Sequence, residues 1–492
     1  MRTLVRLAAA SISVAALAGS ATVAAAGTSA PERLATISPH WTKISPDTGL
    51  GITSAGLLRT ADGRLHVVWP RNDKGSYSLH YSTVGGKAKL LATGTIVSHW
   101  GAIDQFPRLV RAPRGIGQSG IRAIFDGANG QGGSPYNVGT FYSATAGPSG
   151  TSWTLLPGSL SHTTFPPLTD DAATAELNGQ PVTAWSSVTS LSYHLGVDPS
   201  VPAKTPDTQI PVGPSGGVID PTLVTSGGTV WATWFNSSGT ATMGYWVDPI
   251  FSGKAGMRKA PGSGGTNLNN NQPLQPVALA TRNGGGEYLA YCVPTKTISC
   301  GHIALWRLGN KKALTVPGSA GGQDSKVALA AAPGGHLWVL WFDYRTNVIH
   351  AVRTNATATA FGRVLTIVPP AHLFSFEALE AEGSAGPLDI VALETQIGAG
   401  SSDAYFDAQI LPVLTLHASK STVSVSGAVT FTVLDSGSPV KGAVVTFLGK
   451  TAVTDASGTV HFTVKKGTSA GKHPAVAVKP GYTAGHVSVK VT

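Results

Sequence analysis

The sequence predicts an all-β chain: a seven-bladed β-propeller followed by a small β-sandwich. Three observations lead to this fold class. Gly and Pro occur 60 and 32 times in the 492 residues, and both are costly inside helices and useful in tight turns. No segment after the N-terminus repeats its apolar residues with the 3.6-residue period of a helix. A phrase of apolar strand, Gly turn and second strand recurs roughly every 50–60 residues, about the length of a four-stranded blade.

The N-terminal residues are typical of an export signal. Arg2 and Arg6 precede an apolar run that ends near Ala18, and the three alanines at 24–26 offer the small-residue site that signal peptidase cleaves. The run is too short to span a bilayer. We therefore expect residues 1–26 to be a bacterial signal peptide and residues 27–39 a linker. The mature protein is expected to be secreted or cell-wall associated, with no transmembrane anchor after cleavage.

The recurring phrase defines the blades. Its second strand closes on a large apolar residue that is expected in the core: Trp69, Phe125, Trp185, Trp234, Tyr291, Trp341 and Leu393. The seventh unit ends after its third strand, and the segment "HWTKISPDTGL" at residues 40–50 is similar to the outer strands of other units. We expect this segment to complete the last blade and close the ring over residues 40–410, which removes open sheet edges. Six or eight blades remain alternatives because loop insertions blur the count, and a solenoid or two stacked sandwiches would be a different architecture.

One stretch in the second unit resembles a known motif. "FYSATAGPSGTSWTLLPG" is similar to the Asp-box, the Ser-x-Asp-x-Gly-x-x-Trp turn of sialidase-like propellers. Ser143, Gly150 and Trp153 match the motif, whereas Thr145 stands where the aspartate belongs. The resemblance implies a sialidase-like β-propeller and a structural turn, and it assigns no catalytic residue.

The substrate-binding arginines of sialidases are not matched in the same way. The region of the family's first arginine reads "GITSAGLL", with Thr53 or Ser54 at that place. Arg71, Arg108 and Arg345 are other arginines of the expected ligand face, and sequence assigns no triad among them. Because fold resemblance alone does not carry function, sialidase chemistry is kept as an alternative.

Two sets of loops converge on one face of a propeller: those that lead into the inner strands and those between the second and third strands. In this chain they contain aromatic side chains, which stack on sugar rings, and polar side chains, which bond sugar hydroxyls. The expected ligand-binding residues are Trp100, Asp104, Tyr136, His162, Asp220, Asn269, Asp324, Asp343, Tyr344 and Arg345. For each Asp or Asn, the alternative is a turn cap that bonds nearby backbone groups.

The two cysteines, Cys292 and Cys300, are expected to form a disulfide, because an even number of closely spaced cysteines in an exported protein favours pairing. A zinc site would need histidines as well, and only His302 is close in sequence. We therefore expect no metal and no cofactor. The sequence also lacks a phosphate-binding Gly-rich loop, a nucleophile elbow and an HExxH motif.

The chain changes character at residue 411. Residues 411–492 alternate apolar and polar positions between Gly-rich turns, which predicts a β-sandwich. The segments "PVKGAVVTF" and "TDASGTVHFTV" resemble bacterial Ig-like and carboxypeptidase-regulatory-like modules. This region holds eight lysines and two aspartates. The lysines form either an ordinary solvated face or a surface that attracts anionic polymers of the cell envelope.

These features favour a secreted or surface-associated, non-catalytic binding or adhesion protein that recognises glycan through the propeller face. The alternative is a sialidase-like glycoside hydrolase that uses acidic residues of the same loops, since such hydrolysis needs two carboxyl groups at a defined gap. A protein-interaction scaffold is the third hypothesis. The expected partner is a glycan or an anionic envelope polymer rather than nucleic acid, and the oligomeric state is left open.

Overall fold

The computed structural model describes most of the chain after residue 34. Within residues 35–492 it omits 51–52, 104–105, 112–119, 130–140, 158–171, 179, 187–189, 196–207, 212–217, 237–242, 251–255, 265–275, 296–299, 322–323, 372 and 397–401. The expected signal peptide lies outside the described residues. Within the described part, no helix has the length and hydropathy of a membrane span.

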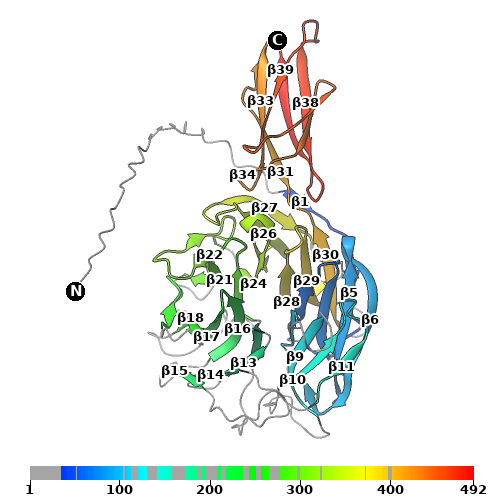
Figure 1. Ribbon diagram of the computed structural model, residues 1–492, viewed down its shortest axis with the longest axis vertical. Helices are drawn as coiled ribbons and strands as arrows, with labels where there is room; N and C mark the ends of the chain where they lie inside the picture. The colour runs from blue at the N-terminus through cyan, green and yellow to red at the C-terminus, as the bar shows by residue number, and fades with distance from the viewer. Residues whose placement is uncertain are drawn as a thin grey trace, which may run out of the picture. The chain divides into compact units, whose positions relative to one another are not determined.

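The described residues up to 410 form seven β-sheets, which we number in chain order (Figure 1). The first sheet contains β3 (Gly56–Arg59), β4 (Leu65–Asn72), β5 (Tyr77–Gly85) and β6 (Lys89–Trp100). The second contains β7 (Ala102–Ile103), β8 (Arg108–Arg111), β9 (Ile121–Ala128), β10 (Phe141–Ala146) and β11 (Trp153–Leu155). The third contains β12 (Ala172–Leu177), β13 (Gln180–Ser186), β14 (Ser190–Leu195) and β15 (Thr208–Pro211). Sheets four and five contain β16 (Val218–Ser226), β17 (Thr229–Asn236), β18 (Gly244–Ile250) and β19 (Arg258–Lys259); and β20 (Ala278–Thr281), β21 (Glu287–Pro294), β22 (Cys300–Arg307) and β23 (Leu314–Thr315). The sixth sheet contains β24 (Asp324–Ala331), β25 (Leu337–Asp343), β26 (Val348–Thr354), β27 (Phe361–Ile367) and β1 (Ala35–Ile37). The seventh contains β28 (Leu373–Glu382), β29 (Leu388–Gln396), β30 (Ser402–Ile410) and β2 (Trp41–Lys43). Two single-turn 3₁₀ helices lie at Gly86–Ala88 and Pro333–Gly335.

The innermost strands of these sheets form a closed ring. β3, β8, β12, β16, β20, β24 and β28 each contact the next inner strand, and β28 contacts β3. Successive strands within a sheet pair antiparallel, so each sheet is an antiparallel meander about the common axis. The all-β propeller expected from the sequence is therefore confirmed.

The N-terminal strand completes the last sheet, as the sequence predicts. β2 pairs antiparallel with β30, with Trp41 opposite Ala408 and Lys43 opposite Phe406. The Ile44 amide continues this pairing by donating to the Tyr405 carbonyl at 2.8 Å. One further element was not predicted: β1 adds to the sixth sheet as a parallel strand beside β27. The start of the described chain thus contributes to two neighbouring sheets.

The residues that close the second strands are core residues. All seven are 0–2% exposed, and the three tryptophans at 69, 234 and 341 are fully buried. They pack between adjacent sheets, where they join clusters of aliphatic side chains. Their regular spacing in sequence therefore reflects the repeated packing position of each sheet.

Residues after 410 form two sheets around a separate hydrophobic cluster. One sheet contains β31 (Leu414–Ala418), β33 (Ala428–Asp435), β34 (Ser438–Pro439) and β37 (Thr459–Thr463), and the other contains β32 (Thr422–Val423), β35 (Val444–Phe447), β36 (Lys450–Val453), β38 (Gly471–Val478) and β39 (Gly485–Val491). Three phenylalanines, Phe431, Phe447 and Phe462, meet edge to face at its centre. We call this part the C-terminal sandwich; its membership of the Ig-like class stays a prediction.

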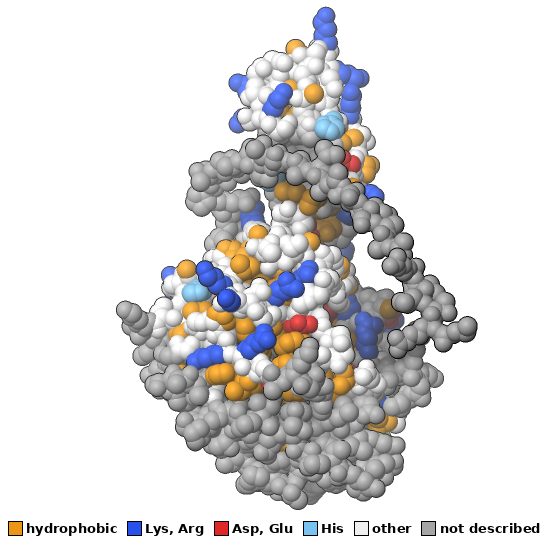
Figure 2. Space-filling view, turned by 60° about the vertical axis from the view of Figure 1, so that its left-hand side comes forward, with side chains coloured by type: hydrophobic (Ala, Val, Ile, Leu, Met, Phe, Trp, Pro, Cys, Tyr) orange, Lys and Arg blue, Asp and Glu red, His pale blue; other side chains and the backbone are white. Residues whose placement is uncertain are grey.

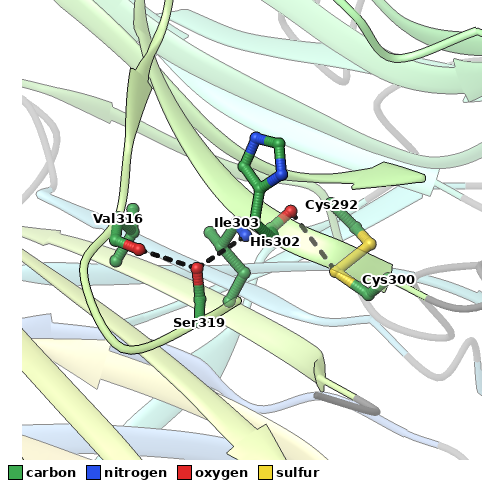
Figure 3. Close-up of a disulfide and its surroundings, with 6 residues drawn as sticks. All are labelled: Cys292, Cys300, His302, Ile303, Val316 and Ser319. Atoms are coloured by element: carbon green, nitrogen blue, oxygen red, sulfur yellow. Dashed lines mark hydrogen bonds between the residues drawn. A yellow bond between two sulfur atoms is a disulfide. The ribbon is translucent and has the colours of Figure 1, made fainter. Parts of the chain in front are cut away.

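The two cysteines form the expected disulfide (Figure 3). Cys292 on β21 and Cys300 on β22 are bonded and their Cα atoms are 5.4 Å apart. Nearby, Ser319 bridges the sheet edge, because its Oγ accepts from the Ile303 amide at 2.9 Å and donates to the Val316 carbonyl at 2.8 Å. The disulfide therefore links the two strands of one hairpin in the fifth sheet.

Candidate active site

Three inner strands carry a charged residue at an equivalent irregular position. β16, β24 and β28 each depart from regular pairing near their first residues, and Asp220, Lys326 and Glu377 lie within these irregular steps. Asp220 and Lys326 have φ values of 50° and 51°, a backbone conformation that is costly for a residue with a side chain. β-bulges redirect side chains and are common beside active sites. We call the end of the ring at which these three strands begin the mouth.

Lys326 is the cation of this group. Its side chain is 3% exposed, and its Nζ has no hydrogen-bond partner among the described residues. Burial lowers the pKa of Lys326 to about 8, while the charges of Glu377 and Asp220 act in the opposite direction. β20 lies between β16 and β24 in the ring, so Asp220 and Lys326 interact electrostatically although their sheets are not neighbours.

A second group is built on Glu380, which lies three residues farther along β28 than Glu377 and contacts Ser54 just before β3. Glu380 accepts a hydrogen bond from Ser54 Oγ, and Arg108 Nη1 lies 3.4 Å from the same hydroxyl. Burial raises the pKa of the Glu380 carboxyl, and the Arg108 charge and the Ser54 hydrogen bond oppose that rise only in part. Glu377 and Glu380 are both half-buried rather than sealed in the core.

These residues give the mouth two kinds of carboxyl group. Asp220 and Glu377 both interact electrostatically with the Lys326 ammonium, and Glu377 also accepts a hydrogen bond from Ser375 Oγ. Glu380 has a raised pKa and lies beside a hydroxyl and a guanidinium. Pairs of titratable groups whose surroundings differ in this way are typical of acid–base sites. The arrangement can supply one carboxylic acid to donate a proton and one carboxylate to act on the opposite side of a bond.

Among the residues predicted from sequence, Asp220 is the one that lies in this group. The predicted residues Asp343, Tyr344 and Arg345 form the turn after β25 at the same end of the ring. Asp343 is a turn cap: its carboxylate accepts from the Arg345 amide at 2.8 Å and from Thr346 Oγ1 at 2.6 Å. Burial raises its pKa, but these hydrogen bonds outweigh burial and lower it overall.

The neighbouring aromatic residue is available at the surface. Tyr344 is 45% exposed, and its hydroxyl donates to the Phe376 carbonyl of β28 at 3.0 Å. Its ring meets Phe342 edge to face. Arg345 extends into solvent beside Asp343. Tyr344 is thus exposed at the rim of the mouth, and the stacking of a sugar on it stays a prediction.

Trp100, also predicted to stack on a sugar, lies in a different environment. It is 5% exposed and packs against Phe125 and Tyr142, as a core residue does. The backbone of Asp324 pairs with Asp343 at the first residue of β24. Four predicted ligand residues lie outside the described part of the chain: Asp104, Tyr136, His162 and Asn269. A role for these residues in ligand binding stays a prediction.

Sequence reasoning missed Lys326, Glu377 and Glu380. Each is a charged residue within or just before an alternating apolar strand, as in "DSKVALA" and "FEALEAE", and such residues usually face solvent. Asp220, Lys326 and Glu377 lie 14, 15 and 16 residues before the closing residues Trp234, Trp341 and Leu393, so an alignment of the repeats without gaps does not bring them to one position. Their equivalence is visible only in the strand pairing. No cluster of three His, Cys, Asp or Glu side chains suited to a metal ion occurs among the described residues.

The comparisons with known proteins concern structure alone. No protein-family model matches the chain, and no curated protein matches it in sequence. Similar solved structures include a polysaccharide lyase of family PL25, an ulvan lyase bound to a glucuronate–sulfated rhamnose unit (10% identity, 75% of this chain and 96% of that chain, TM-score 0.47). They also include the Penicillium chrysogenum α-L-arabinanase complexed with arabinobiose (10% identity, 75% and 99%, TM-score 0.42) and a Bacteroides ovatus GH43B protein (10% identity, 92% of each chain, TM-score 0.33).

These neighbours correct one expectation. The sequence favoured a non-catalytic binding or adhesion protein, whereas the structures similar to this chain are glycan-cleaving propeller enzymes. The alternative of a glycoside hydrolase fits them better. At these identities the likeness extends to the fold, so any chemistry has to come from the residues of this chain.

Proposed function

We propose that this protein cleaves glycosidic bonds of a polysaccharide at the mouth of the ring. The observation that carries the proposal is the pair of glutamates on β28, which lie three residues apart in different surroundings. Glu380 has a raised pKa and accepts a hydrogen bond from Ser54, whereas Glu377 accepts one from Ser375 and interacts electrostatically with the Lys326 ammonium. Glycoside hydrolysis needs one carboxylic acid and one carboxylate across the scissile bond.

In the proposed reaction Glu380 gives its proton to the leaving oxygen as the bond from that oxygen to the anomeric carbon breaks. Glu377 supplies the carboxylate, which either attacks the anomeric carbon or takes a proton from the attacking water. In the first case water later releases the sugar and Glu380 recovers its proton. The anomeric configuration of the first product, read by NMR, distinguishes the two routes.

The first test is a substrate screen with residues 27–492. Arabinan, xylan, galactan, xyloglucan and ulvan are each incubated with the protein, and new reducing ends and unsaturated products are measured separately. The proposal expects reducing ends without ultraviolet-absorbing unsaturated sugar from at least one polymer. Unsaturated products would assign elimination instead of hydrolysis, and no cleavage of any polymer would contradict the proposal.

We also propose that the C-terminal sandwich attaches the enzyme to an anionic polymer of the cell envelope. Seven of its eight lysines are exposed, and Lys472 stands directly opposite Lys490 on neighbouring strands, although like charges opposite one another cost stability. One of its two aspartates, Asp435, is buried in an ion pair with Arg353. Figure 2 shows lysine side chains, in blue, on the surface of this sandwich, which has no arginine.

Attachment of this kind should weaken with salt, because the attraction acts between exposed charges. Residues 27–492 are expected to sediment with immobilised poly(glycerol phosphate) at about 50 mM salt and to be released at about 500 mM, where screening is far stronger. The double variant Lys472→Gln/Lys490→Gln should bind less, and Lys87→Gln in the ring is the matched control. Binding that persists at high salt would contradict the proposal.

A further inference from the structure

The Lys326 ammonium is unusual because it is buried, charged and without a hydrogen bond to any described residue. A lysine ammonium has three N–H donors, and a buried charge that leaves them unused costs free energy. Its backbone is also in a strained left-handed conformation, with φ 51°. Structure of this kind destabilises a protein unless a ligand uses it, and such strain is found at functional sites.

The surroundings of Lys326 indicate which ligand it fits. Asp220 and Glu377, from the fourth and seventh sheets, both interact with it electrostatically. Two carboxylates already compensate one ammonium, so the group offers no net positive charge to a sugar carboxylate or sulfate. What it offers is a set of donors beside acceptors. A sugar hydroxyl is both donor and acceptor and matches this combination.

We propose that Lys326 and Asp220 form a specificity-determining subsite for an uncharged sugar ring with two adjacent hydroxyls. The ammonium donates to one hydroxyl, and the neighbouring hydroxyl donates to the Asp220 carboxylate. The sugar therefore lies between the fourth and sixth sheets, with its reacting bond directed toward Glu377 and Glu380 on the seventh. This inference rests on the proposed function for the direction of the bond, and its hydrogen bonds do not depend on cleavage.

Lys326→Met tests the subsite, because methionine fills similar space and cannot donate. The variant removes unused donors, which favours stability, but it also leaves Asp220 and Glu377 without the cation that compensates them, which lowers stability, so its melting temperature is measured first. Lys87→Met is the matched control: Lys87 also has a left-handed backbone, with φ 61°, and is exposed. A melting temperature well above the temperature of the binding assay shows that a loss of binding is not a loss of folding.

Binding is measured by calorimetry in a Glu380→Gln background, so that ligands are not consumed. The probes are the methyl glycosides of arabinofuranose, xylose, galactose, rhamnose and glucuronic acid, with the monodeoxy analogues of any that binds. We expect an uncharged glycoside to bind, and Lys326→Met to lower its affinity about tenfold or more, the scale of one hydrogen bond to a charged group. Lys87→Met should leave the affinity unchanged. One monodeoxy analogue should lack the hydroxyl that Lys326 binds. Its affinity for the protein with Lys326 should therefore equal the affinity of the parent sugar for the Lys326→Met variant.

Several results would overturn the subsite. They are unchanged affinity in Lys326→Met, preferential Lys326-dependent binding of the glucuronide, and no binding of any uncharged glycoside. The proposed function fails separately. Lys326-dependent binding by a protein that cleaves no polymer would leave the subsite standing and remove the hydrolase. If Lys326→Met cleaves a polymer with an unchanged KM, the hydrolase stands and the subsite is contradicted.

Discussion

At the scale of single residues, Glu394 shows what an unused buried acid costs. This glutamate on β29 is fully buried, and neither carboxyl oxygen has a hydrogen-bond partner within the described part of the chain. Burial raises its pKa to about 9. The folded protein therefore holds a proton that the unfolded chain releases between about pH 4.5 and 9, and stability falls as pH rises through that range.

Glu394→Leu should remove both the destabilising buried carboxyl group and the pH dependence that its titration causes. We expect the free energy of unfolding to increase by about 1–3 kcal/mol at pH 5, the cost of a buried polar group without a partner. The gain should become larger toward pH 9. Urea denaturation at several pH values measures this, and Glu394→Gln is the control that keeps a polar group without the titration. A leucine variant less stable than the unmodified protein would show that Glu394 has a partner.

The candidate site could be predicted from the sequence only in part, for a reason that belongs to this scale. Asp220 was identified because it stands in an obvious loop phrase, "GGVID". Lys326 and Glu377 lie in the first half of apolar strands, where a charged residue usually faces solvent. Both residues lie at bulges, in β24 and β28, and a bulge of one residue leaves no mark in a single sequence.

At the scale of elements, the closing strand was predictable because the seventh unit visibly lacks an outer strand. The segment at residues 40–50 has the pattern of the outer strands, and β2 does pair with β30. The parallel strand β1 could not be predicted in this way, since "ATI" is too short to show a pattern. Strand pairing with a distant partner is decided by tertiary packing, and three residues carry little information about it.

Ile44 links the closing strand to the ring. Its side chain is 1% exposed and packs between the first and seventh sheets. Ile44→Ala should lower the free energy of unfolding by about 2–5 kcal/mol, the usual cost of such a cavity in a core. Guanidinium denaturation provides the value. Thr36→Ala, at an exposed position of β1, should change it by less than about 0.5 kcal/mol, and equal effects of the two variants would argue against a closing role.

At the scale of the whole molecule, the fold was more predictable than the function. A repeat of apolar strands favours a ring, because each sheet has two apolar faces and needs a neighbouring sheet on each of them. That requirement is visible in the spacing of the buried aromatic residues. A binding protein and a hydrolase on the same ring differ by a few polar residues at the mouth. Under the proposed function, the difference between them lies in the surroundings of Glu377 and Glu380, which arise from strands far apart in sequence.

The most direct measurement of the central claim compares two leaving groups. Phenyl and 2,4-dinitrophenyl glycosides of the sugar identified in the substrate screen are given to the unmodified protein and to Glu380→Gln, with Glu394→Gln as a control. If Glu380 donates the proton, its variant should lose about 10²–10⁴-fold in kcat/KM on the phenyl glycoside. The loss on the dinitrophenyl glycoside, whose leaving group needs no proton, should be less than about tenfold. Equal losses on both substrates, or no loss on either, would contradict the account.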